Sequence, residues 1–136
     1  MKVNNKHYRT VWFEDSTVFL INQNLLPFKF SIYKSKNYPE TCNAIKTMIV
    51  RGAGAIGATA GFAMAQAILQ APKNNFIEYV KKAKKDIEST RPTAQNLFFA
   101  TNRVFNALKH SKEFALEQAN NIADENKRIN RITKNR

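Results

Sequence analysis

Residues 53–71 read AGAIGATAGFAMAQAILQA, and this stretch decides the fold of the chain. It carries no charged side chain, and alanine or glycine occupies most of its positions. A helix that is apolar all round is buried, and small side chains let its neighbours pack close to its backbone. We therefore predict a central buried helix over residues 53–71, with the other elements of the chain packed around it.

The segments on either side predict an α+β domain. Runs of β-branched and aromatic residues indicate strands at 8–13, 17–21 and 28–33, with a turn at 14–16 and a connection at 25–27. Helical spacing of apolar residues indicates further helices from Pro39 to Ile49 and over 75–89, 93–109 and 111–132. The fold expected for residues 1–136, taken as one domain, is a small N-terminal antiparallel β-sheet (1–34) followed by a bundle of about five α-helices (38–132).

Three helix starts have local signals. Pro39, with Glu40 behind it, is typical of a first helical turn. Asn75, with Glu78 three residues later, resembles a capping box. Pro92 is expected to open the helix over 93–109, since proline is favoured in a first turn.

The composition gives weaker information about partners. The formal net charge is +12, which could indicate a nucleic-acid-binding protein. However, residues 1–50 hold 7 basic and 3 acidic groups, 51–100 hold 7 and 3, and 101–136 hold 8 and 4, so each segment has the same excess of +4. Specific nucleic-acid binding is therefore not expected. No apolar run is long enough to span a membrane and no signal-peptide core follows Met1, so we expect a cytoplasmic protein without membrane contact.

An anion site is predicted where the central helix begins. Arg51, Gly52 and Ala53 stand at its N-terminus, where free amides and the helix dipole attract negative charge. Arginine adds a bidentate fork for phosphate oxygens. A second arginine, Arg91, lies in the segment Thr90-Arg91-Pro92-Thr93 before another helix. Each loop alone is equally consistent with an ordinary turn between helices, but together, at one end of the bundle, they would make a phosphate site.

Catalytic machinery is harder to find. Cys42 lies on an apolar helix stripe and is interpreted as a core residue. Because it is the only cysteine of the sequence, an internal disulfide is excluded. His7 and His110 have no metal-ligand spacing to a partner, and Glu14-Asp15 is typical of a hairpin turn. We therefore predict no catalytic residue, no metal site and no cofactor in this chain.

Four segments carry a resemblance to a known family: Tyr8-Arg9-Thr10-Val11-Trp12-Phe13, Leu25-Leu26-Pro27, residues 48–57 (MIVRGAGAIG) and Thr90-Arg91-Pro92-Thr93-Ala94-Gln95-Asn96-Leu97. They resemble the N-terminal domain of 5-methylthioribose-1-phosphate isomerase. That superfamily includes the alpha, beta and delta subunits of translation initiation factor 2B and ribose-1,5-bisphosphate isomerase. The first and last segments favour the isomerase branch.

The resemblance implies that Arg51, Gly52, Ala53 and Arg91 contact the substrate. It also implies that the isomerisation of an aldose 1-phosphate to a ketose 1-phosphate uses a cysteine and an aspartate of a C-terminal Rossmann-like domain, which the 136 residues do not include. Cys42 does not match that cysteine. The family usually has proline where this chain has Gly54, and glycine loosens the first helical turn by up to about 1 kcal/mol, which would make a poorer anion cradle.

The leading hypothesis is a truncated or split methylthioribose-1-phosphate isomerase of methionine salvage, inactive without a C-terminal domain. Its expected partners are the sugar phosphate, a separate polypeptide that carries the C-terminal domain, or a second copy of the chain. The alternative is a binding or regulatory module like the subunits of initiation factor 2B.

Overall fold

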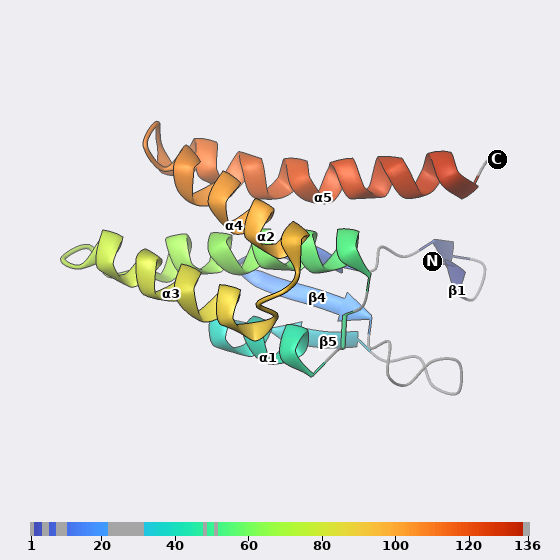
Figure 1. Cartoon of the computed structure of the whole chain (residues 1–136), viewed down its shortest axis with the longest axis horizontal. Coiled ribbons are helices and arrows are strands. Elements are labelled where there is room, and N and C mark those ends of the chain that lie inside the picture. Colours follow the sequence, from blue (N-terminus) through green and yellow to red (C-terminus); the bar gives the residue numbers. More distant parts are fainter. Residues whose placement is uncertain are drawn as a thin grey trace.

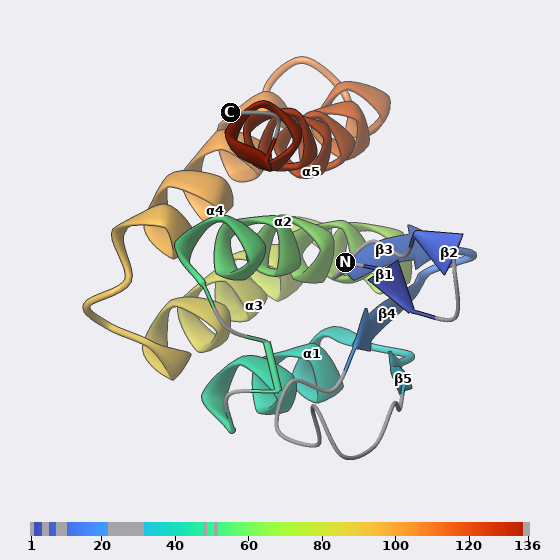
Figure 2. The same ribbon diagram turned by 90° about the vertical axis from the view of Figure 1, so that its right-hand side faces the viewer.

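A long helix, α2 (Ala53–Gln70), runs through the middle of the structure. The computed structural model describes residues 2–3, 6–7, 11–21, 32–47, 49–50 and 52–134. The other described helices are α1 (Tyr38–Lys46), α3 (Phe76–Thr90), α4 (Gln95–Ala107) and α5 (Lys112–Lys134). All four contact α2, with α5 on one side and α1 and α3 on the other (Figures 1 and 2). The predicted α+β class and its five helices are confirmed.

A three-stranded antiparallel sheet covers a further side of α2 (Figure 2). Its strands follow in the order β3 (Val11–Glu14), β4 (Thr17–Ile21) and β5 (Ile32–Ser35). The predicted strand at 17–21 is confirmed. The expected strands at 8–13 and 28–33 are seen in part, because 8–10, 28–31 and the connection at 25–27 lie outside the described residues. A hairpin of two-residue strands, β1 (Lys2–Val3) and β2 (Lys6–His7), is too short to leave a periodic signal in the sequence.

The turn between β3 and β4 is the predicted one. Asp15 and Ser16 have φ angles of 48° and 65°, which gives the two-residue loop whose backbone twist matches that of an antiparallel hairpin. Glu14 pairs with Thr17 in the strand register. The Glu14-Asp15 pair is therefore part of a hairpin turn.

The predicted starts of α1 and α3 are confirmed, although the capping box expected at Asn75 does not form, and the predicted start of α4 is wrong. Asn37 Oδ1 accepts a hydrogen bond from Glu40 N at 2.9 Å at the start of α1, with Pro39 in the first turn. Asn75 makes no such bond, because its ψ of 40° is not the extended backbone that aims a capping side chain. Helix α4 begins at Gln95, since Ala94 N donates to Arg91 O at 3.0 Å and closes a separate turn that contains Pro92.

The end of α1 also differs from the prediction. The helix ends at Lys46, three residues before Ile49. Ile49 N donates to Ala44 O at 3.0 Å, outside the helical pattern, and its side chain is buried after the chain has left the helix. Burial of Ile49 thus comes from tertiary packing, which the helical spacing in the sequence could not distinguish from a longer helix. Met48 lies outside the described residues.

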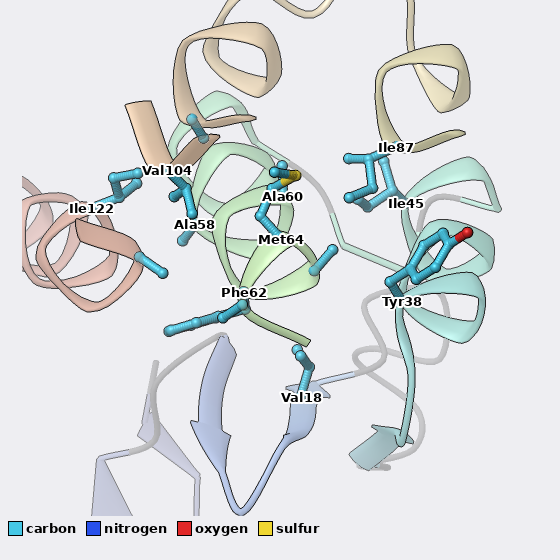
Figure 3. Close-up of a cluster of buried hydrophobic side chains, with 14 of the residues drawn as sticks. Val18, Tyr38, Ile45, Ala58, Ala60, Phe62, Met64, Ile87, Val104 and Ile122 are labelled. Atoms are coloured by element: carbon cyan, nitrogen blue, oxygen red, sulfur yellow. The ribbon is translucent and has the colours of Figure 1, made fainter. Parts of the chain in front are cut away.

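The core lies around α2, where every residue from Ala55 to Ile68 is buried. Figure 3 shows side chains of the sheet, α1, α3, α4 and α5 converging on this helix. Phe62 stacks on Phe13 of β3 with ring centroids 5.3 Å apart. On another side, Gly61 lets α5 approach, since a Cβ there would lie 3.5 Å from Ile122 and 3.7 Å from Ala119. The predicted central buried helix is confirmed. None of the helices in the described part of the chain is long and apolar enough to cross a membrane.

A buried polar cluster ties the sheet to α1 and α2. Gln66 of α2 is fully buried, and its Nε2 donates to Ser16 O at 3.0 Å and to Ser35 O at 2.8 Å. Thr41 Oγ1 of α1 donates to Gln66 Oε1 at 2.6 Å. One glutamine therefore holds the β3–β4 turn, the end of β5 and the side of α1 in a fixed arrangement.

Candidate anion-binding site

The N-terminus of α2 has no side-chain cap. Gly52 is the N-cap residue, and the first bond within the helix runs from Ile56 N to Gly52 O at 2.9 Å. The amides of the first turn, residues 53–55, have no partner within the helix in such an arrangement. Gly52 and Ala53 are both exposed. This end of α2 therefore presents N–H groups that have no partner within the helix, together with the positive end of the helix dipole.

Gly52 has a backbone that only glycine adopts easily. Its φ is 93° and its ψ is 137°, a region in which a side chain would be strained. A Cβ at this position would meet nothing within 4 Å. Among the described residues nothing fills the space in front of this backbone, and glycine is required here by conformation.

Arg91 lies in the turn between α3 and α4. It follows the last turn of α3, whose final carbonyls accept bonds from Ser89 Oγ (2.8 Å, to Asp86 O) and Thr90 Oγ1 (2.6 Å, to Ile87 O). Arg91 is partly exposed, and among the described residues its guanidinium forms no ion pair. The side chain is thus held on an ordered turn without a carboxylate partner from the described part of the chain.

The structure brings the start of α4 against the start of α2. A Cβ on Gly57, in the second turn of α2, would lie 3.3 Å from Asn96 O in the first turn of α4. The turn that carries Arg91 therefore lies at the same end of the bundle as Gly52 (Figures 1 and 2). Of the four predicted contact residues, Gly52, Ala53 and Arg91 are placed in this region, and Arg51 lies outside the described residues.

Cys42 has the character of a core residue. It lies on α1, half-buried, and packs against the hydrophobic core. Burial, followed by the negative charge of Asp86, raises the pKa of its thiol to about 12. A thiol with that pKa is almost entirely neutral at pH 7 and is a poor nucleophile or base. His110 packs its ring edge-on against Phe114 at 5.3 Å. The residues described here contain no group of three or more His, Cys, Asp or Glu placed to hold a metal ion.

We expect Cys42 to react slowly with iodoacetamide at pH 8 and rapidly once the chain is unfolded in guanidinium chloride. Because its pKa is raised by folding, from 9.0 to about 12, the neutral thiol stabilises the fold fully below pH 9 and this contribution is lost as the pH rises toward 12. The melting temperature of a Cys42→Ala variant should fall less steeply than that of the parent between pH 9 and 10.5. Equal alkylation rates in native and unfolded protein would contradict the burial of this thiol.

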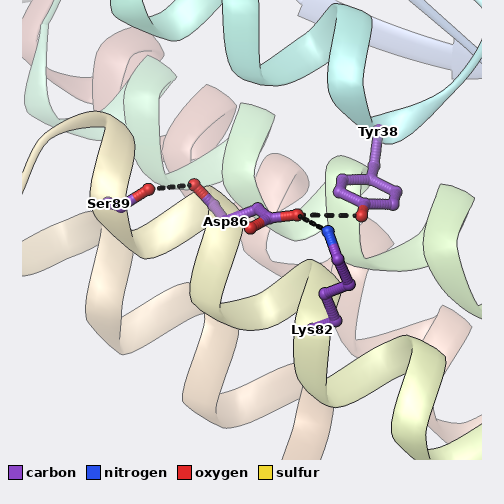
Figure 4. Close-up of polar contacts among 4 residues, drawn as sticks. All are labelled: Tyr38, Lys82, Asp86 and Ser89. Atoms are coloured by element: carbon purple, nitrogen blue, oxygen red, sulfur yellow. Dashed lines mark hydrogen bonds and ion pairs between the residues drawn. The ribbon is translucent and has the colours of Figure 1, made fainter.

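Two polar contacts around α3 were not anticipated from the sequence. Tyr38 Oη donates to Asp86 Oδ2 at 3.0 Å, and Lys82 Nζ lies 3.0 Å from the same oxygen (Figure 4). Burial, with the bond to Asp86, raises the pKa of Tyr38. The spacing of four residues between Lys82 and Asp86 is typical of an ion pair on a helix. The hydrogen bond between Tyr38 and Asp86 has no such signal in the sequence, because 48 positions separate these two residues.

The chain is similar in sequence to known proteins. Residues 49–136 match the model of the "Initiation factor 2 subunit family". Over 109 residues the chain is 41% identical to methylthioribose-1-phosphate isomerase of Acetivibrio thermocellus. This alignment covers 78% of this chain and 32% of that protein.

Two solved structures are similar in fold and sequence. The 5-methylthioribose 1-phosphate isomerase of Pyrococcus horikoshii OT3 superposes with a TM-score of 0.83 and 40% identity, over 88% of this chain and 37% of that one. The delta subunit of translation initiation factor eIF-2B from A. fulgidus gives a TM-score of 0.75 and 36% identity, over 88% and 36%. The chain thus spans less than two fifths of the length of each of these relatives.

The family match begins just before the loop that precedes α2 and includes all of α2 to α5. It therefore takes in the uncapped N-terminus of α2 and the turn of Arg91, the two parts of the candidate site. Since the match covers well over half of the chain, the chain belongs to the initiation factor 2 subunit family.

Proposed function

We propose that this chain binds a sugar phosphate, 5-methylthioribose 1-phosphate, at the N-terminus of α2. In this proposal it is the substrate-binding part of a methylthioribose-1-phosphate isomerase of methionine salvage. The observation that carries the proposal is the uncapped start of α2, opened by Gly52, with the Arg91 turn packed at the same end of the bundle. The names of the relatives, at 40–41% identity, support the choice of ligand.

Each part of the site has a role in holding the phosphate. The amides of residues 53–55 donate to its oxygens, and the positive end of the α2 dipole stabilises its charge. Arg51 and Arg91 add bidentate, charge-assisted hydrogen bonds. Gly54, in place of the family's usual proline, gives the first turn of α2 more freedom before the ligand binds.

Binding by these residues does not amount to turnover. Aldose–ketose isomerisation moves a proton between neighbouring carbons and needs a positioned acid and base. Cys42 is unsuited to that role, because its thiol is half-buried on α1 with a pKa of about 12. We propose that the proton-transfer groups come from residues outside these 136, and that the 136 residues alone bind without turnover.

An NMR titration of the ¹⁵N-labelled chain with 5-methylthioribose 1-phosphate tests this proposal. It is run at about 150 mM salt, where long-range attraction to the +12 chain is screened. Saturable shifts are expected at the amides of Gly52, Ala53 and Arg91. Arg91→Ala should weaken binding by about tenfold or more, since loss of a charge-assisted bond removes at least about 1.4 kcal/mol. Arg51→Ala should have a similar effect.

The control variant is Lys109→Ala. It removes the same charge from an exposed position just beyond the C-terminal end of α4, away from the helix start that faces α2. Binding by this variant should equal that of the parent. Methylthioribose without phosphate should not bind measurably. Absence of saturable shifts, or equal weakening by Lys109→Ala and Arg91→Ala, would contradict a specific phosphate site.

A second candidate is a binding module like a subunit of initiation factor 2B. The observation in its favour is the similarity to the A. fulgidus delta subunit, with a TM-score of 0.75. It predicts no saturable binding of the sugar phosphate, and stable association of the purified chain with initiation factors or ribosomes. The titration above and a co-sedimentation assay with ribosomes therefore discriminate between the two candidates.

A further inference from the structure

The candidate site depends on how closely α4 approaches α2, and Gly57 is where they meet. A Cβ built on Gly57 would lie 3.3 Å from Asn96 O, 3.5 Å from Asn96 Cβ and 3.7 Å from Asn96 C. The nearest of these atoms is a backbone carbonyl oxygen, which cannot rotate away as a side chain could. Any side chain at position 57 would therefore displace the first turn of α4 by a few tenths of an ångström.

A second contact links α4 to α3, the helix on the other side of the Arg91 turn. Thr101 is fully buried in α4, and its Oγ1 donates to Glu88 Oε2 at 2.6 Å. Lys84 Nζ lies 2.8 Å from the same oxygen. Glu88 precedes the Arg91 turn and Thr101 follows it, so this contact ties together the two helices that the turn joins. Helix α4 is thus in contact with α2 at Gly57 and with α3 through Thr101, and the Arg91 turn leads into it.

We propose that Gly57 is a positioning residue, which lets α4 lie against α2 and so holds the Arg91 turn beside the N-terminus of α2. The Glu88–Thr101 contact secures the turn on its other side. The inference rests on the proposed function in one respect: the purpose of this placement is anion binding. It assigns to Gly57 an effect on ligand affinity without contact with the ligand.

The chain offers a matched control for this proposal. Gly57→Ala and Gly61→Ala are the same substitution at two buried positions of α2, about one turn apart. Both variants gain the same helix propensity. A Cβ at position 61 would lie 3.5 Å from Ile122 Cδ1, the end of a flexible side chain on α5, and no closer to backbone than 3.7 Å. That is ordinary van der Waals contact, and it is directed away from α4.

The first measurement needs no ligand. Ala94 N donates to Arg91 O and closes the turn, so hydrogen exchange of the Ala94 amide reports on the turn directly. Exchange of this amide is expected to speed up about tenfold in Gly57→Ala and to stay unchanged in Gly61→Ala. Equal exchange in the two variants would overturn the proposal. If Gly57→Ala does not fold, Thr101→Val replaces it, because it keeps the shape of the side chain and removes the hydrogen bonds of Oγ1 to Glu88 Oε2 and to Phe98 O.

The second measurement is the affinity for 5-methylthioribose 1-phosphate, with inorganic phosphate as a smaller probe. Gly57→Ala should raise the Kd several-fold for both probes, while Gly61→Ala leaves it unchanged. Faster exchange of Ala94 with unchanged affinity would overturn the role of Gly57 in binding. If the parent chain binds neither probe, the proposed function fails, and the exchange of Ala94 still decides whether Gly57 places the turn.

Discussion

Replacing Phe62 with alanine is expected to lower the free energy of unfolding by about 4 kcal/mol. Phe62 is 2% exposed, and it lies between α2 and the sheet, stacked on Phe13 at 5.3 Å (Figure 3). Because α2 consists mainly of alanine and glycine, few neighbouring side chains are long enough to fill the cavity that would remain. Urea unfolding followed by circular dichroism at 222 nm measures the change.

Phe99→Ala is the control for this prediction. Phe99 is 61% exposed on α4, so its truncation should change the free energy of unfolding by no more than about 0.5 kcal/mol. Equal losses for Phe62→Ala and Phe99→Ala would mean that the sheet does not pack on α2 as described. The m-value should stay the same in both variants, since neither changes the surface exposed on unfolding by much.

Replacing Gln66 with leucine is expected to lower the free energy of unfolding by about 3 kcal/mol. The two side chains are similar in size, so the loss comes from hydrogen bonding. Leucine would remove the Gln66 donor from the carbonyl oxygens of Ser16 and Ser35, and one of the acceptors for Thr41 Oγ1. A buried polar group without a partner loses its hydration and gains nothing in exchange.

Gln70→Leu provides the matched comparison. Gln70 lies one turn after Gln66 on the same helix, is exposed, and makes one hydrogen bond, from its Nε2 to Lys36 O at 2.7 Å. Solvent can replace that partner, so the expected loss is less than about 1 kcal/mol. A loss for Gln66→Leu as small as that for Gln70→Leu would show that the polar cluster does not hold the sheet to the helices.

The family assignment and the candidate site rest on different observations. The family match spans residues 49–136 and the fold agrees with two solved relatives. The site was predicted from local signals, namely glycine and arginine before a helix. Of these, the structure accounts for Gly52 by its φ of 93°, and it places Arg91 on the turn that leads into α4, whose first turn lies against α2 at Gly57.

Some features could not be predicted because their causes lie far apart in the sequence. Gly57 looked like one of several small residues in an apolar helix, and only its approach to Asn96 distinguishes it from Gly61. Gln66 is a polar residue within a mostly apolar stretch of sequence. Its partners, Ser16, Ser35 and Thr41, belong to the β3–β4 turn, β5 and α1, which come earlier in the chain. Nothing local to either position signals these contacts.

The sequence by itself determined the order and type of the five helices and of the three-stranded sheet, but not the short hairpin of β1 and β2. Hydrophobic periodicity and composition are properties of consecutive residues, and a helix as apolar as residues 53–71 has no stable place except the core. The tertiary structure alone decided where α1 ends, where α4 begins and which glycine of α2 lies against a backbone carbonyl of α4. Those features depend on contacts between residues that are far apart in the chain, and such contacts form only when the helices and the sheet pack around α2.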